Sequence, residues 1–449
     1  MLFHTHEFLA LLLVTLAVFH LAPLPRRPLV LLVASLVFYG YAGLGMLGLF
    51  LAVSAFAYFC LRRIEAGERQ WVGIGVAVIL VNLMAFKYGP FLPVGISFYS
   101  FQLIAVLIDA GRGQKLEVRS FRELLLFIMF FGHLIAGPIM RGREFFPQLH
   151  VLPGPTTSQL RSGILLFLVG LIKKVVLADA LLSPRVDALF ASGSDLSVAA
   201  AWLAPLLFGF QIYFDFSGYV DMALGMSRFF GLELMPNFST PFISRTPSEF
   251  WSRWNITLSR WFGDYVYIPL GGSRGRIWIT VRNLLITMAL SGIWHGAGWT
   301  FLAWGVIHGV YLAAFHVLRH AVPRVAASLA EGGLRPLGWI TTFAVTTIAW
   351  VYFRAADVGH ANAIVANMFG ITPGTASAPG PGFAIVAVLL LLHRAETWWI
   401  ANLDVIAERA GERWMRLPGP VQALAAFPIL FVVVAITKGA RGTFIYFQF

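Results

Sequence analysis

Residues 284–304 read LLITMALSGIWHGAGWTFLAW and contain one ionisable side chain, His295. A helix of this length and composition can cross about 30 Å of hydrocarbon. Runs almost free of charge also occupy residues 8–22, 71–86 and 421–437. Roughly eleven to thirteen such segments follow one another with short polar joints. The sequence therefore predicts an all-α, polytopic bundle of spanning or re-entrant transmembrane helices, folded as one membrane domain over residues 1–449.

The composition supports this class. Of the 449 residues, 58% are hydrophobic and 12% are charged, whereas soluble globular chains are about half apolar and about a quarter charged. This difference excludes a soluble enzyme. The apolar runs are continuous and do not alternate, so they indicate helices and not a transmembrane barrel.

The net charge of +12 comes from basic residues scattered over the loops, which does not indicate a nucleic-acid partner. The lipid bilayer and its anionic headgroups explain these residues better. Basic pairs or clusters follow the first, third and fifth expected spans, at Arg26 and Arg27, at Arg62 and Arg63, and at residues 112–122. Because Lys and Arg gather in cytoplasmic loops, this pattern predicts an N-terminus outside the cytoplasm.

Residues 236–283 differ from their flanks because they are rich in Trp, Arg, Pro and Gly. Ser248 before Glu249 suggests a helix start. Apolar or aromatic side chains then recur at helical spacing, at Phe250, Trp251, Trp254, Leu258 and Trp261. We expect an amphipathic helix that lies in the membrane interface or re-enters the protein. A plain cytoplasmic surface helix with an aromatic belt is the alternative.

His295 is the strongest candidate for chemistry. At about 1.5 Å per residue it lies about 16 Å into its expected span, near the middle of the bilayer. An ionisable group at that depth is costly and tends to face a cavity or a partner. A neutral imidazole can accept the proton of a hydroxyl group near neutral pH. Gly296 and Gly298 leave room for a substrate or another backbone, and a structural hydrogen bond between helices is the alternative role.

Asn255 and His308 are weaker candidates. The Asn255 amide could donate to the oxyanion of an acyl-transfer intermediate, or it could simply lie on a helix surface. On an unbroken helix His308 would point about 220° away from His295. The two could converge only if Gly296, Gly298 or Gly305 marks a break, so we expect His308 to have a packing or supporting role.

Asp215 is a third polar group at membrane depth, within QIYFDFSGYVDMALG. Together with Gln211 and Tyr219 it lies on one helical face at four-residue spacing. This face could line the same cavity as His295, or it could be a structural polar cluster between helices. The sequence contains no phosphate-binding glycine loop, serine nucleophile elbow or His/Cys metal pattern, so we predict neither a bound metal or cofactor nor a covalent serine intermediate.

Seven blocks of sequence, in order, resemble the membrane-bound O-acyltransferase family, and within it the bacterial branch of alginate O-acetylation. The resemblance runs from about residue 87 to the C-terminus. The blocks are FKYGPFLPVGISFYSFQ, HLIAGPIMRGREFFPQL, QIYFDFSGYVDMALG, FWSRWNITLSRWFGDYVYIPLGG, SGIWHGAGWTFLAWGVIHG, WVYFRA and FIYFQF.

The resemblance implies helices around a central funnel, with an active-site histidine in WHGAGWTF, here His295. The second polar position of the family falls in FWSRWN. Relatives in the bacterial branch typically have His there and many eukaryotic members have Asn; this chain has Asn255. One base and one amide that orients the acceptor or the acyl carbonyl fit this pattern. We expect the substrate-binding positions to be Asp215, Trp251, Trp294 and His308.

The resemblance further implies acetyl-CoA as the cytoplasmic thioester donor and a hydroxyl of a surface or exported polysaccharide as the acceptor. In that branch the membrane protein passes acetyl groups to a periplasmic acetyltransferase, which suggests such a partner, and a location in the bacterial inner membrane. D-alanyl transfer to teichoic-acid-type polymers ranks lower, because PLGG after YVYI and the closing FIYFQF resemble the alginate branch. A proton-coupled secondary transporter and a scaffold that recruits a periplasmic enzyme are alternatives from other classes.

Overall fold

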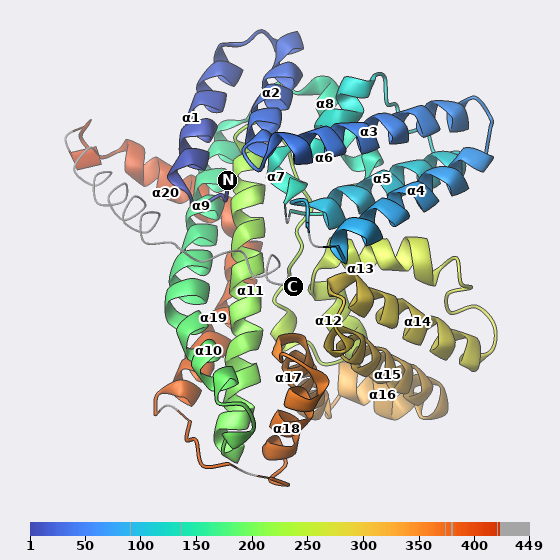
Figure 1. Ribbon diagram of the computed structural model, residues 1–449. Coiled ribbons are helices and arrows are strands. Elements are labelled where there is room, and N and C mark those ends of the chain that lie inside the picture. The colour runs from blue at the N-terminus through green and yellow to red at the C-terminus, as the bar shows by residue number, and fades with distance from the viewer. Residues whose placement is uncertain (90, 136, 373, 379, 420, 423–449) are drawn as a thin grey trace. The chain divides into compact units, whose positions relative to one another are not determined.

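The computed structural model describes residues 1–89, 91–135, 137–372, 374–378, 380–419 and 421–422 (Figure 1). Regular structure in these residues is helical, and the one β-type pairing among them is an isolated bridge between Leu196 and Ala376. The predicted all-α class is confirmed. Most of the expected span 421–437 and the closing FIYFQF block lie outside the described residues.

Seven helices of the described residues are long and apolar enough to cross a membrane. Two shorter apolar helices, α1 (His6–Leu21) and α5 (Ile96–Gly111), accompany them. The chain is therefore a multi-pass membrane protein. The seven are α3 (Leu44–Glu65), α4 (Gln70–Lys87), α11 (Val198–Arg228), α14 (Ile277–His295), α15 (Trp299–Ala321), α17 (Arg335–Arg354) and α19 (Gly382–Ala401).

Contacts divide the chain into two compact units. The first unit holds residues 1–175, 218–236 and the described residues from Leu403 onward. Its helices beyond those already given are η1 (Leu24–Arg26), α2 (Arg27–Gly40), α6 (Phe121–Met129), α7 (Phe131–Leu134), α8 (Gly142–Val151), α9 (Thr157–Leu171), the start of η2 (Ile172–Leu182) and α20 (Leu403–Met415).

In the first unit, α9 packs closely against α11 through glycine residues. Gly163 and Gly170 of α9 lie against Gly225 and Gly218 of α11, and a Cβ atom at any of the four would strike the facing backbone. Such small-residue contacts allow helices to pack closely where the hydrophobic effect is absent. An ion pair of 2.6 Å between Lys173 and Asp221 joins the start of η2, which directly follows α9, to α11.

The second unit holds residues 176–217 and 237–402 of the described chain, including the first two thirds of α11. Its remaining elements are α10 (Ser183–Ala191), η3 (Gly193–Asp195), η4 (Pro241–Ile243), α12 (Pro247–Arg253), α13 (Ile256–Phe262), η5 (Gly263–Tyr267), α16 (Pro323–Ala330) and α18 (Val358–Met368).

Helices α14 and α15 form an antiparallel hairpin in the second unit and run side by side in Figure 1. A Cβ atom on Gly292 would collide with the carbonyl oxygen of Phe301, and one on Gly305 with that of Met288. The two backbones therefore touch through glycine. This contact fixes the register of the hairpin.

Residues 236–283 contain two short helices where one amphipathic helix was expected. Helix α12 begins at Pro247, capped by Thr246, whose Oγ1 accepts a hydrogen bond of 3.1 Å from the Glu249 N–H. The helix ends before Trp254, and Asn255 has the left-handed backbone conformation, with φ of 41°. The predicted helical spacing of Phe250, Trp251, Trp254, Leu258 and Trp261 therefore spans two helices, with a break at residues 254 and 255. The re-entrant placement of this segment stays a prediction.

Candidate functional site

His295 is the last residue of α14 and does not lie in the middle of one span, so the expected continuous helix over 284–304 is wrong. Gly296 is extended, and Gly298 caps the start of α15. At Gly296 a Cβ atom would overlap the ring of Phe301. The Gly-Ala-Gly sequence thus lets the chain reverse immediately after the histidine.

The imidazole of His295 is buried, with 5% of the residue exposed. Three rings surround it edge-on, at centroid distances of 4.8 Å for Trp294, 4.8 Å for Trp304 and 5.1 Å for Phe353. Edge-to-face packing of this kind is the favoured arrangement of aromatic pairs. Rings from α14, α15 and α17 therefore set the orientation of the imidazole.

His308 lies two turns into the same hairpin and joins the same cluster. Its ring is stacked on Phe250 at 5.9 Å and lies edge-on to Trp251 and Trp304, at 5.0 Å from each. Trp304 thus contacts both histidines. The break at residues 296–298 meets the condition under which the sequence allowed the two histidines to converge, and Trp304 lies between them.

Several polar atoms of this cluster have no hydrogen-bond partner in the described part of the chain. They are Nε1 of Trp251 and Trp304 and Nε2 of His308. Buried polar atoms in native structures are nearly always satisfied. These donors and acceptors are therefore available to a bound polar group.

Asn255 is buried, and its left-handed backbone conformation sets the direction of its side chain. Asn is among the residues that tolerate the left-handed region best. The neighbouring turn is held by Asn237, whose Oδ1 accepts hydrogen bonds from the backbone N–H and the hydroxyl of Thr257 at 3.3 and 2.5 Å. The Oδ1 of Asn255 itself accepts no hydrogen bond from the described residues.

A chain of rings joins the Asn255 segment to the histidine cluster. Trp254 lies 5.0 Å from Trp350, and Trp350 lies 5.4 Å from Phe353, the ring that packs on His295. Trp304, Trp350 and Phe353 were not singled out from the sequence. Trp304 could have been found, because it lies four residues before His308 and therefore on the same helical face.

Asp215 lies on α11 as predicted, on one face with Gln211 and Tyr219. Seven residues earlier on the same face, Phe208 contacts Trp350 at 6.1 Å and Phe353 at 6.3 Å. Residue 215 therefore lies two turns, about 10 Å of helix rise, further along the face that packs on the cluster. The structure brings together Trp251, Trp294, His295 and His308, and it places Asp215 beyond them.

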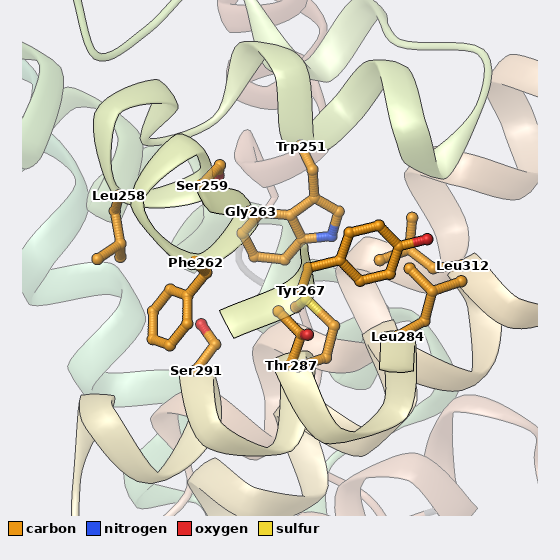
Figure 2. A pocket seen from close by; sticks show the side chains of 11 residues that line it. Trp251, Leu258, Ser259, Phe262, Gly263, Tyr267, Leu284, Thr287, Ser291 and Leu312 are labelled. Carbon is orange, nitrogen blue, oxygen red and sulfur yellow. The ribbon is translucent and has the colours of Figure 1, made fainter. Parts of the chain in front are cut away.

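A cavity of about 120 Å³ lies next to this cluster (Figure 2). Trp251, Phe262 and Tyr267 line it from the 236–283 segment, and α14 supplies Thr287 and Ser291. In Figure 2 these two side chains stand on the side of α14 that faces Trp251 and Phe262. Trp251 is a wall shared by this cavity and the histidine cluster.

The same unit contains a buried polar network that no sequence pattern indicated. Tyr213 donates a hydrogen bond of 2.6 Å to Glu396, whose carboxylate lies 3.2 Å from Nδ1 of His393. Nε2 of His393 accepts a hydrogen bond of 3.2 Å from the backbone N–H of Phe242. The network joins α11, α19 and η4.

Comparison with known proteins identifies the family of this chain. The model of the membrane-bound O-acyltransferase family matches residues 36–354. The chain is 40% identical over 408 residues to the probable alginate O-acetylase AlgI of Azotobacter vinelandii, covering 84% of this chain and 80% of that protein. It is 34% identical over 391 residues to the peptidoglycan O-acetyltransferase of Helicobacter pylori, covering 76% and 73%.

A more distant relative is the teichoic acid D-alanyltransferase of Streptococcus thermophilus, 29% identical over 261 residues, covering 54% of this chain and 61% of that protein. The family match includes the α14–α15 hairpin, the Asn255 turn and the rings of α17. The chain is an O-acyltransferase and belongs to the membrane-bound O-acyltransferase family.

Proposed function

We propose that this protein transfers an acetyl group from a cytoplasmic thioester, acetyl-CoA, toward a hydroxyl group of an exported polysaccharide in the bacterial inner membrane. Relatives named for alginate and peptidoglycan O-acetylation support a polymer acceptor. The arrangement around His295 carries the proposal, because three rings fix an imidazole at the glycine break of a membrane hairpin.

In the proposed step, His295 takes the proton of the acceptor hydroxyl. The oxygen then bonds to the thioester carbonyl carbon, and the carbon–sulfur bond breaks as the tetrahedral intermediate collapses. The leaving thiolate receives the proton from the imidazolium, so the histidine returns to its starting state. The Asn255 amide donates a hydrogen bond to the oxyanion, and the backbone break at residue 255 aims that amide.

The size and lining of the cavity beside Trp251 favour a short acyl group as the one transferred. Its volume of about 120 Å³ is below the ~150 Å³ of an engineered cavity that admits benzene. The lining consists of apolar side chains, glycine and the hydroxyls of Ser259, Thr287, Ser291 and Tyr267, with no carboxylate among them. An acetyl group fits this lining better than a D-alanyl group, whose ammonium would need an anionic or strongly polar partner.

Asp215, Trp251, Trp294 and His308 complete the proposal as substrate-binding positions. Trp251 lines the cavity and His308 packs on Trp251, and each has a ring nitrogen without a hydrogen-bond partner in the described residues. Asp215 extends the α11 face that packs on the cluster. A periplasmic acetyltransferase as the next acceptor, and an N-terminus outside the cytoplasm, belong to the same proposal.

The direct test uses the purified full-length protein in proteoliposomes with acetyl-CoA labelled in the acetyl group and an added oligosaccharide acceptor, with or without a periplasmic acetyltransferase from the same cells. We expect labelled ester on the sugar, released by mild alkali. A D-alanyl-loaded carrier protein in place of acetyl-CoA should give no product. Ester formation from the D-alanyl donor alone would overturn the proposal in favour of alanyl transfer.

A further inference from the structure

A second cavity of the same unit, about 650 Å³ in volume, differs from the first in charge. Four guanidinium groups line it, from Arg245, Arg253, Arg335 and Arg394, against one carboxylate, from Glu249. These side chains come from the loop between η4 and α12, from α12 itself, and from α17 and α19. The lining therefore carries a formal excess of three positive charges, since arginine stays protonated in proteins.

The one carboxylate is already engaged. Glu249 pairs with Arg253 at 3.0 Å and accepts a hydrogen bond of 2.8 Å from the backbone N–H of Arg245. Among the described residues, the side chains of Arg245 and Arg335 donate only to backbone carbonyls, of Ala330 and Gly332. Arg394 has neither a hydrogen bond nor an ion pair within the described residues. Three guanidiniums thus converge on the cavity without an acidic partner in the part of the chain that the structure describes.

The opposite wall is apolar. Ala387, Leu390, Leu391 and Arg394 recur on one face of α19 at helical spacing, so the face is apolar for two turns and then basic. Leu391 is 70% exposed on a helix apolar enough to span the membrane. Trp339 of α17 completes the lining, as expected for an aromatic side chain at the level of lipid headgroups.

We infer that this cavity binds the headgroup of an anionic glycerophospholipid, with the phosphate on Arg245, Arg335 and Arg394 and an acyl chain along Leu390 and Leu391. Basic pockets between transmembrane helices have this use, and guanidinium groups bind phosphate oxygens in a bidentate manner. A soluble nucleotide phosphate would match the arginines and leave the exposed leucines uncovered. The basic part of the lining suits a phosphate and the apolar part suits an acyl chain, so the whole lining suits an amphiphile.

Lipid binding in this cavity would also affect the histidine cluster, because α12 contacts both. Helix α12 presents Glu249 and Arg253 to the cavity, while Phe250 and Trp251 on the same helix contact His308. A bound headgroup would fix α12 against α17 and α19. Acyl transfer, which here depends on the proposed function, should then rise with the anionic lipid content.

The test measures lipid binding and activity separately. The full-length protein is reconstituted in phosphatidylcholine nanodiscs containing palmitoyl-oleoyl phosphatidylglycerol, and lipid retained after detergent extraction is measured by native mass spectrometry. Arg394→Gln should weaken phosphatidylglycerol retention about fivefold, which corresponds to about 1 kcal/mol per arginine near the membrane surface. Arg335→Gln combined with Arg394→Gln should reduce it about 25-fold. The matched control is Arg319→Gln with Arg324→Gln, two exposed arginines outside the cavity, which should bind phosphatidylglycerol like the wild type.

Equal retention of phosphatidylglycerol by the wild type and the Arg394 variant would overturn the inference. So would displacement of the lipid from the wild type by free coenzyme A at equal concentration, which would assign the arginines to the soluble donor. Because Arg394 makes no polar contact in the described chain, its single substitution tests the site even if the double variant folds poorly. Loss of activity with retained lipid binding would count against the proposed function and not against the lipid site.

Discussion

Two buried histidines of the second unit have opposite surroundings. His393 lies between a carboxylate and a backbone N–H, at 3.2 Å from each. His295 is enclosed by the edges of Trp294, Trp304 and Phe353. A histidine with polar partners on other elements joins those elements, whereas rings packed around an imidazole set its orientation. The polar network gives His393 a structural role, and the proposed function gives the chemistry to His295.

The largest effect should come from replacing His295 with Gln, which keeps a polar side chain but removes the base. We expect acetyl transfer to fall by about 10²–10⁴-fold, with thermal unfolding in detergent close to that of the wild type. Initial rates with labelled acetyl-CoA and a fluorescence-detected unfolding curve measure the two properties. A variant that transfers acetyl at the wild-type rate would contradict the proposed base.

The next largest effect concerns Asn255. Replacement by Gly keeps the left-handed backbone permissible and removes the amide, so a loss of about 10²–10³-fold in kcat is expected if the amide stabilises the oxyanion. Replacement by Ala removes the amide and also strains the backbone by about 1–2 kcal/mol. Comparing the two separates the chemistry from the turn. An active Gly variant with a weakened Ala variant would leave Asn255 with a structural role only.

His393→Ala should reverse the pattern seen at His295. It leaves the Phe242 N–H and the Glu396 carboxylate with unsatisfied hydrogen-bonding capacity, so the free energy of unfolding should fall by about 1–3 kcal/mol. Activity per folded molecule, measured below the new unfolding temperature, should be retained within a few fold. A His393 variant that unfolds normally and is inactive would erase the distinction between the two histidines.

The smallest effect is one of selectivity. Leu284→Ala enlarges the cavity beside Trp251 by the volume of an isobutyl group less a methyl. The ratio of kcat/KM for butyryl-CoA over acetyl-CoA should rise by about tenfold, since one or two methylenes in an apolar pocket are worth about 1–3 kcal/mol. Leu337→Ala, an exposed residue outside this lining, is the control. An unchanged ratio would remove the cavity from acyl recognition.

Several members of the ring cluster around His295 could be named from the sequence, but their arrangement could not. His295, Trp294, Trp251 and His308 could be named because ionisable and aromatic groups stand out in apolar runs. The convergence of His295, Trp251 and His308 on Trp304 could not be derived, because it depends on whether the chain breaks after His295. The His393 and Glu396 pair gave no signal either, since its partners are about 150 to 180 residues away in sequence.

The sequence by itself determined the membrane class and the helical architecture, because continuous apolar runs must satisfy their backbone hydrogen bonds internally in lipid. It also determined where glycine permits close approach or reversal. Only the tertiary structure decided that α14 ends at His295, that Asn255 interrupts the aromatic helix, and that four arginines from separate segments line one cavity. Those features result from packing between distant segments, which local composition and periodicity do not specify.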